Sequence, residues 1–155
     1  MRLEELYPAG ERIALGSYLF AAEDIIRFAS AYDPQPFHTD AEAAKHTLFG
    51  GLCASGWHTC AAWMRCFVDH HAGETARLTR EGIAAPKVGP SPGFRNLQWL
   101  RPVFAGDTVR YFATLTGSRP LVTRPGWRLV SMVNEGVNQD DQPVMRFDGS
   151  VLEFE

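Results

Sequence analysis

Residues 57–69, WHTCAAWMRCFVD, have the composition of a helix that is apolar on almost every side. The polar side chains His58, Arg65 and Asp69 form one narrow stripe along it. A helix this apolar belongs in the middle of a fold, with little of its surface exposed to water. The segment before it, FGGLCASG at residues 49–56, is a loop punctuated by glycines. The sequence therefore predicts a buried central helix that begins directly after this loop.

The stretches after the central helix alternate in the manner of strands. They are residues 94–103, 107–116, 127–137 and 143–154, and residues 12–20 form an earlier strand with β-favouring side chains. The side chains expected to share a face are Leu97, Trp99 and Val103; Val109, Tyr111, Ala113 and Leu115; and Trp127, Leu129 and Val133. Turn signals at 106–107 and 140–143 keep the connections short, which predicts an antiparallel sheet. The expected architecture is α+β, with this sheet wrapped around the central helix.

Two further helices and a long loop complete the expected elements. Residues 21–32 carry apolar side chains at helical spacing, and residues 40–46 look like a short helix with Asp40 as its N-cap. Pro34 and Pro36 end the first of these helices, and we expect the stretch that contains them to be extended and not helical. Residues 72–93 are rich in glycine and proline and are expected to form a long loop, part of a substrate pocket or its lid.

Length and composition narrow the class of protein. The chain has 155 residues, 45% of them hydrophobic and 21% charged, which predicts one domain over residues 1–155 with a core of its own. A net charge of -3 without a basic run argues against nucleic acid as a partner. The absence of a long apolar run argues against a membrane span, and MRLEELYPAG does not resemble a signal peptide. The odd count of 3 cysteines fits reduced thiols in a cytoplasmic protein.

The densest polar cluster is YDPQPFHTD, residues 32–40. Asp33 and His38 lie in a stretch that the prolines make stiff, and such a stretch is a plausible platform for acid–base chemistry. A carboxylate can orient an imidazole whose ordinary pKa lies near neutrality. The same residues could also have plain structural roles, with Asp33 capping a turn and His38 simply packed.

A second candidate is Ser55-Gly56, directly before the central helix. The first N–H groups of a helix are free donors with partial positive charge, so they could polarise an ester or thioester carbonyl as an oxyanion hole does. Gly56 would let a ligand approach the backbone closely. Alternatively, the glycines could simply allow tight helix packing.

Several other polar groups favour a structural interpretation. Asp69, His70 and His71 resemble a metal cluster, but adjacent helical side chains diverge and no recognised zinc motif accompanies them, so no metal is expected. Cys53 or Cys60 could be a nucleophile, but buried cysteines usually act as small apolar residues. His46 and His58 are expected to be structural, and Arg80 and Lys87 are expected to be solvated, although they could meet CoA phosphates.

FASAYDPQPFHTD, followed by FGGLCASG, resembles the D-x-N-P-x-H segment and the downstream F-x(6)-G of MaoC-like dehydratases, which include the (R)-specific enoyl-CoA hydratases. LQWLRPVFAGDTV, residues 97–109, is similar to a strand–P-V-x-x-G-D–strand unit of the same family. The resemblance covers most of the chain. It implies the hot-dog fold, a long helix wrapped by an antiparallel sheet.

The resemblance also implies roles for individual residues. Asp33 and His38 match the residues that hold a water and move protons during addition to, or elimination across, the α,β-double bond of an acyl thioester. Gly56 matches the glycine whose N–H polarises the thioester carbonyl. Substrate contacts are expected from Gln35, Pro36, Phe37, Phe49 and Ser55. The implied substrate is an acyl-CoA or acyl-carrier thioester with no further cofactor, and the implied working unit is a homodimer.

This chain departs from the family pattern at three positions. Gln35 replaces the asparagine, Ser55 stands where a histidine often precedes the glycine, and Met64 lies where some hydratases have a serine. Hydratase or dehydratase chemistry is therefore the leading hypothesis. The alternatives are a hot-dog acyl-CoA thioesterase and a non-catalytic acyl-CoA binding module.

Overall fold

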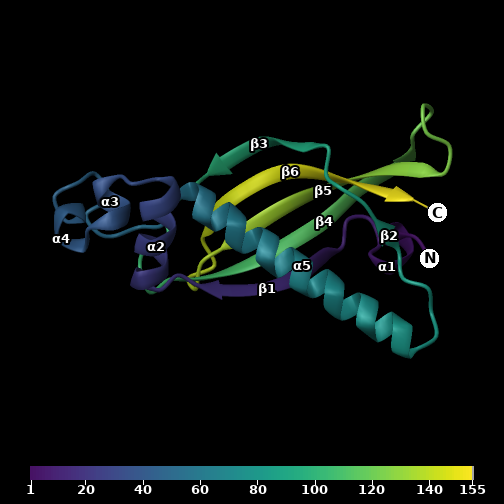
Figure 1. Cartoon of the computed structure of the whole chain (residues 1–155), viewed down its shortest axis with the longest axis horizontal. Coiled ribbons are helices and arrows are strands. Elements are labelled where there is room, and N and C mark those ends of the chain that lie inside the picture. The colour runs from purple at the N-terminus through teal and green to yellow at the C-terminus, as the bar shows by residue number, and fades with distance from the viewer. Residues whose placement is uncertain (155) are drawn as a thin grey trace.

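The computed structural model describes residues 1–154, which form a curled sheet over one long helix (Figure 1). The helices are α1 (Leu3–Leu6), α2 (Ala22–Tyr32), α3 (Pro36–Thr39), α4 (Ala41–Ala44) and α5 (Gly56–Arg80). The strands are β1 (Arg12–Leu19), β2 (Lys87–Val88), β3 (Gly93–Trp99), β4 (Thr108–Pro120), β5 (Trp127–Val137) and β6 (Pro143–Phe154). Helices α2, α3 and α4 gather beyond one end of the sheet, and both termini lie near the other end.

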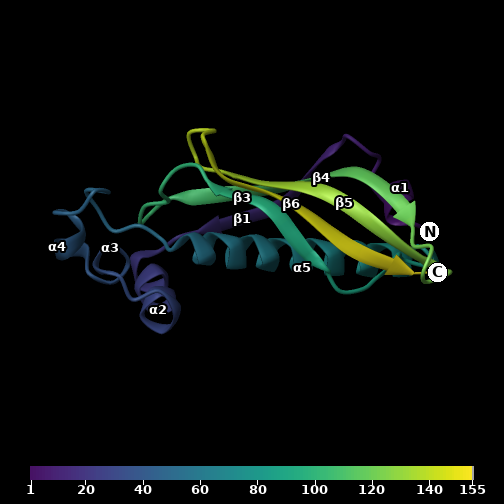
Figure 2. The ribbon, with the colours of Figure 1, turned by 90° about the horizontal axis from the view of Figure 1, so that it is seen from above.

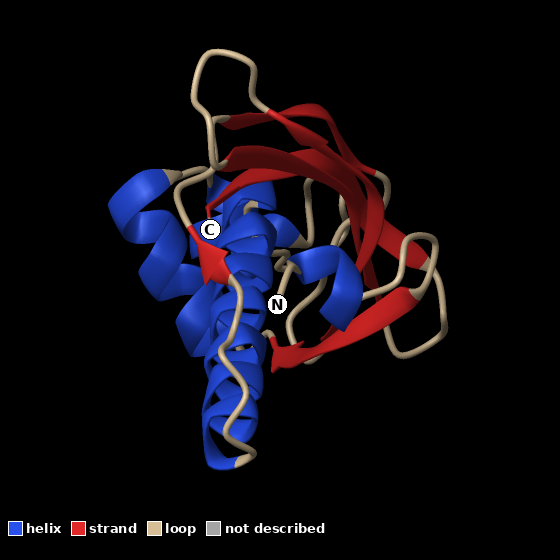
Figure 3. Ribbon diagram, turned by 90° about the vertical axis from the view of Figure 1, so that its right-hand side faces the viewer, coloured by secondary structure: helices blue, strands red, loops and turns tan. Residues whose placement is uncertain are grey.

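The strands form one antiparallel sheet in the order β1-β4-β5-β6-β2, with β3 also paired to β6. The sheet lies along one side of α5 when seen from above (Figure 2). Seen from its end, it curls around that helix (Figure 3). The predicted α+β arrangement is confirmed, and the curl places the concave face of the sheet against the helix.

The side chains predicted to share a face do so in both β4 and β5, but only those of β4 form the core face. Val109, Tyr111, Ala113 and Leu115 are all buried. In β5 the buried side chains include Val130, Met132 and Asn134, whereas Trp127, Leu129 and Val133 share the less buried face. Because alternate side chains point to opposite faces, the polar Asn134 obscured which set of β5 faces the core.

Helix α5 is longer than predicted, since it runs for 25 residues and includes residues 72–80 of the expected loop. Gly73 does not interrupt it, and Arg77 makes ion pairs with Glu74 and Glu81 one turn away on either side. Leu78 is fully buried and anchors this second half. Asp69, His70 and His71 therefore lie inside the helix and not at its end.

The expectation that the central helix has little exposed surface is wrong on one face. Trp57, Met64 and Val68 are 51%, 48% and 52% exposed. The opposite face is buried, where Ala62, Trp63 and Cys66 pack into the main core cluster. Among residues 1–154, no helix is long and apolar enough to cross a membrane.

The stretch after α2 is also more helical than expected. Pro36 opens the short helix α3, because proline suits the first helical position, where its missing N–H has no partner to lose. Asp40 caps α4 as predicted, and its carboxylate accepts the N–H groups of Glu42 and Ala43 at 2.9 and 3.0 Å.

Candidate functional site

Asp33 and His38 lie together at the junction of α2, α3 and the start of α5. Asp33 ends α2 as its C-cap, and His38 projects from α3. Oδ2 of Asp33 lies 3.4 Å from Nε2 of His38. The imidazole is buried and the carboxylate is partly exposed, so the pair sits at the boundary between the protein interior and an open cavity.

The Asp33 carboxylate is held by two side-chain donors. Nε2 of Gln35 donates to Oδ1 at 2.6 Å, and Oγ of Ser55 donates to Oδ2 at 2.7 Å. Partial burial raises the pKa of Asp33, but these two hydrogen bonds and the nearby His38 outweigh it, so the pKa lies below its usual value. Asp33 is therefore ionised at neutral pH.

A backbone contact sets the tautomer of His38. Its Nδ1 lies 2.6 Å from the carbonyl oxygen of Cys53. A carbonyl can only accept, so Nδ1 carries a proton and donates it to this bond. In the neutral ring, Nε2 is then a bare acceptor that faces Asp33 and can take up a proton.

The N–H of Gly56 points out from the first turn of α5. Ser55 is the N-cap, but its hydroxyl binds Asp33 and not the helix backbone. Within residues 1–154, no acceptor meets the Gly56 N–H. A Cβ at position 56 would lie 2.3 Å from Cε2 of Trp99, so a larger residue here would force the indole or the helix terminus to move. The indole of Trp99 thus lies directly on the Gly56 backbone.

A cavity of about 530 Å³ brings these groups together. Of the predicted site residues, Asp33, His38, Gly56, Gln35 and Phe49 line it. The other three are not among its lining residues. Pro36 begins α3, Phe37 packs edge-on against both His38 and Phe49, and Ser55 is fully buried beneath Asp33.

Sequence reasoning missed several residues of this cavity. Tyr32, Trp57, Trp99, Leu100 and Arg101 line it, and Arg101 brings a positive charge to the site. The indoles of Trp57 and Trp99 meet edge-to-face with centroids 5.2 Å apart. Alternation predicts only that Trp99 lies in a strand. No local pattern connects the end of that strand to the start of α5, so the sequence did not place Trp99 at the site.

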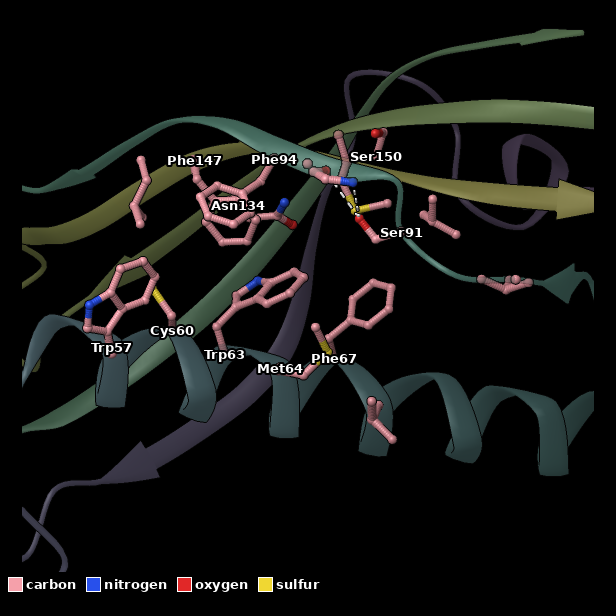
Figure 4. A pocket seen from close by; sticks show the side chains of 18 residues that line it. Trp57, Cys60, Trp63, Met64, Phe67, Ser91, Phe94, Asn134, Phe147 and Ser150 are labelled. Atoms are coloured by element: carbon pink, nitrogen blue, oxygen red, sulfur yellow. Dashed lines mark hydrogen bonds between the residues drawn. The ribbon is translucent and has the colours of Figure 1, made fainter. Parts of the chain in front are cut away.

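A second cavity, of about 360 Å³, lies between α5 and the sheet (Figure 4). Trp57 lines both cavities, so it stands where they adjoin. Val88, Gly89 and Ser91 contribute to the wall of this second cavity. The predicted lid over residues 72–93 therefore contributes only its last part, and to this cavity instead of the one that contains Asp33.

The remaining histidine and charged candidates lie outside both cavities. His58 is buried between aromatic rings, stacked on Phe28 with centroids 4.7 Å apart, and burial lowers its pKa. Asp69 pairs with Arg65, and His70 bonds the Tyr7 hydroxyl at 3.0 Å. In the part of the chain that the structure describes, no group of three metal-ligating side chains is found. Arg80 ends α5, about 35 Å from Gly56 along the helix axis.

The cysteine thiols have the character of packed, protonated groups. Cys53, Cys60 and Cys66 are all free. Sγ of Cys53 lies 3.7 Å from Nδ1 of His38, but that nitrogen is committed to the Cys53 carbonyl. Burial raises the pKa of Cys53 to about 11, which makes its thiolate scarce at neutral pH. A cysteine nucleophile is therefore disfavoured at this site.

The fold agrees with what comparison with known proteins shows. The chain belongs to the MaoC-like dehydratase family, because the MaoC like domain matches residues 10–125. The MaoC-like dehydratase from Rhodospirillum rubrum is similar in structure over 100% of this chain and 97% of its own, with 33% identity and a TM-score of 0.80.

More distant similarity is found both to a solved structure and to a protein sequence. The unliganded R-hydratase PhaJ1 from Pseudomonas aeruginosa is 21% identical, with a TM-score of 0.67 over 95% of this chain and 82% of its own. The uncharacterized protein YdeM from Bacillus subtilis (strain 168) is 24% identical over 152 residues, 98% of both chains. The curled antiparallel sheet around α5 is thus the hot-dog fold.

Proposed function

We propose that this protein is an acyl-thioester hydratase or dehydratase that adds water across, or eliminates it to form, the α,β-double bond of an enoyl-CoA-type substrate. One observation carries the proposal: Asp33, His38 and the free Gly56 N–H all face one cavity. Membership of the MaoC-like dehydratase family supports it. The thioester is the substrate, and the reaction needs no further cofactor.

The roles follow from the geometry. The Asp33 carboxylate and the bare Nε2 of His38 are both acceptors, so each can hold one hydrogen of a water molecule between them and the substrate. Water oxygen bonds to the β-carbon as the electron pair of the double bond shifts toward the α-carbon. A water proton passes to the dyad, and the dyad then delivers that proton to the α-carbon. Meanwhile negative charge develops on the thioester oxygen. We assign the stabilisation of that charge to the Gly56 N–H, and a donor of this kind contributes about 2.7–4 kcal/mol to the transition state.

The test is hydration of a panel of enoyl-CoAs, including branched and dicarboxylic ones, followed by loss of the enoyl-thioester absorbance. Asp33→Asn and His38→Ala should each lower kcat about 10²–10⁴-fold, the usual range for losing an acid–base group. Asp40→Asn is the matched control, because Asp40 lies near the same loop but caps α4, and asparagine caps equally well. Unchanged activity in both dyad variants would remove these residues from the mechanism.

The same assay separates the competing functions. A thioesterase would release free thiol from saturated acyl-CoA, and a binding module would bind CoA esters with no turnover of any kind. The cavity with Asp33 and His38 at its wall favours addition of water to the double bond. To identify the preferred carrier, the same acyl chain is presented on CoA and on acyl carrier protein, and the two turnover rates are compared.

We propose further that the protein acts as a homodimer in the cytoplasm. Two observations support the dimer. The exposed side chains Trp57, Met64 and Val68 form an apolar face of α5, and β3 pairs with β6 but with no other strand among residues 1–154. An apolar face beside an open strand edge is a surface that pairing would cover. The free thiols support a reducing compartment.

A further inference from the structure

The cavity between α5 and the sheet is apolar and carries no charged side chain among its described lining residues. Helix α5 contributes Trp57, Cys60, Trp63, Met64 and Phe67 to it. The facing wall comes from β3, β5 and β6, as Figure 4 shows for Phe94, Asn134 and Phe147. Trp57 lines both this cavity and the one that contains Asp33, so an acyl chain that extends past Trp57 from a thioester at Asp33 would enter it.

Asn134 is the exception in this apolar wall. It is 0% exposed, and neither its Oδ1 nor its Nδ2 has a partner within the described chain. A Cβ at position 149 would lie 2.8 Å from Nδ2, so Gly149 leaves the space that the amide occupies. Burying an amide without hydrogen bonds is costly, and proteins rarely leave such a group unmatched. The amide lines the cavity and offers it one acceptor and two donors.

A second unmatched donor lines the same cavity. Trp63 is nearly fully buried, and its Nε1 also lacks a partner among residues 1–154. Its ring is held edge-on against Phe147 with centroids 4.7 Å apart, so the indole has little freedom to turn toward another acceptor. Trp63 and Asn134 belong to opposite walls, the helix and the sheet, and both appear in Figure 4. The cavity thus has donors on two sides and an acceptor on one.

We infer that the preferred acyl chain carries a neutral oxygen, a hydroxyl or keto group, well beyond the β-carbon, and that Asn134 and Trp63 bind it. This inference rests on the proposed function for the direction in which the chain runs. A carboxylate does not fit, because the described lining offers no cation to compensate its buried charge. Trp63 follows Gly56 by about two helical turns, so the oxygen lies about 10 Å along α5 from the thioester carbonyl.

Binding measured by calorimetry tests the inference without requiring turnover. The ligands are decanoyl-CoA and a series of hydroxydecanoyl-CoAs that differ in the position of the hydroxyl beyond the β-carbon. We expect at least one isomer to bind about tenfold more tightly than the plain chain, the size of effect that pairing buried polar groups produces. If no isomer exceeds the plain chain by more than about threefold, the amide instead serves trapped water and the inference is wrong.

Variants locate the effect. Asn134→Leu, which keeps the branched shape and removes the polar atoms, should abolish the preference for the hydroxylated chain. Met132→Leu, on the same face of β5 and the same cavity wall, should leave the ratio of the two affinities near that of the wild type. Trp63→Phe keeps a ring and removes the N–H. The same affinity ratio measured in this variant tests the assignment if the Asn134 variant does not fold. A ratio unchanged in Asn134→Leu or Trp63→Phe overturns the assignment.

Hydration assays on the corresponding 2-enoyl chains keep the two proposals separate. Absence of turnover together with a tenfold binding preference would sink the hydratase proposal and leave the ligand assignment standing. Equal turnover and equal binding of plain and hydroxylated chains would support the hydratase proposal and overturn the ligand assignment.

Discussion

At the scale of the residue, Asp33 shows how local donors prepare a carboxylate. Hydrogen bonds from Gln35 and Ser55 stabilise its ionised form, and its pKa lies below the usual value although burial alone would raise it. The stability that these bonds contribute is present above the unfolded-state pKa, about 3.9, and is lost as the pH falls through the lower folded-state value. The ionised site should persist into mildly acidic solution.

Replacing Gln35 by methionine tests this assignment. The variant loses one donor to Asp33, so the pKa of Asp33 should rise toward its usual value. The acid limb of kcat/KM against pH should therefore move to higher pH. Gln98→Met, at an exposed position with no described side-chain bond, is the control. An acid limb that stays in place would mean that Asp33 does not control it.

Gly56 is the position where one methyl group matters most. Gly56→Ala places a Cβ 2.3 Å from the Trp99 ring, so either the indole or the helix terminus must move. We expect a loss of about 1–3 kcal/mol in the free energy of unfolding, measured with urea, and a loss of hydration activity.

Two further variants make this test specific. Gly73→Ala in the same helix meets nothing within 4 Å and should instead stabilise the protein by about 0.5–1 kcal/mol. In a Trp99→Ala background, Gly56→Ala should cost less stability than it does in the wild type, because the indole that obstructs the new methyl group is gone. Additive losses in the double variant would show that the indole is not the obstacle.

At the scale of the element, the second half of α5 depends on Leu78. Leu78 is 2% exposed, and Leu78→Ala should lower the free energy of unfolding by about 2–5 kcal/mol. Leu48→Ala is the same substitution at a side chain that is 95% exposed and should change stability by less than about 0.5 kcal/mol. Equal effects of the two substitutions would mean that residues 72–80 do not pack as the structure has them.

Sequence patterns predicted the elements in which the spacing of apolar side chains matches the periodicity of a helix or a strand. The core face of β4, the helix α2 and the Asp40 cap are of this kind, because local propensity and burial agree there. The resemblance of residues 28–40 and 49–56 to MaoC-like dehydratases predicted the hot-dog fold. It also predicted a shared site for Asp33, His38 and Gly56, and these three residues line one cavity.

The remainder depends on tertiary contacts that no local pattern contains. Glycine and proline over residues 72–93 suggested a loop, whereas burial of Leu78 and ion pairs of Arg77 extend the helix. In β5, the polar side chain of Asn134 lies on the core face, so alternation of apolar residues could not indicate which face is buried. The contact of Trp99 with Gly56 joins the end of one strand to the start of a distant helix, so spacing could not reveal it.

At the scale of the whole molecule, the exposed face of α5 predicts the oligomeric state. The wild type should be a dimer in light scattering at micromolar concentration. Val68→Asp places a charge on that face and should give a monomer, because burying an unpaired charge costs much free energy. Val122→Asp, at a side chain that is 95% exposed and lies in the β4–β5 connection, should leave the dimer intact. A monomeric wild type would contradict the proposed assembly.

The distribution of tryptophan gives the molecule an optical property. Of its 4 tryptophans, Trp57, Trp63 and Trp99 line the two cavities, and only Trp127 lies apart from them, against Phe154. Intrinsic fluorescence therefore comes mostly from the route that an acyl thioester would follow. The edge-to-face pair of Trp57 and Trp99 should also couple electronically, so a ligand that displaces Trp99 from Gly56 would change the emission and the near-ultraviolet dichroism together. The protein thus carries an unlabelled reporter for the arrival of its substrate.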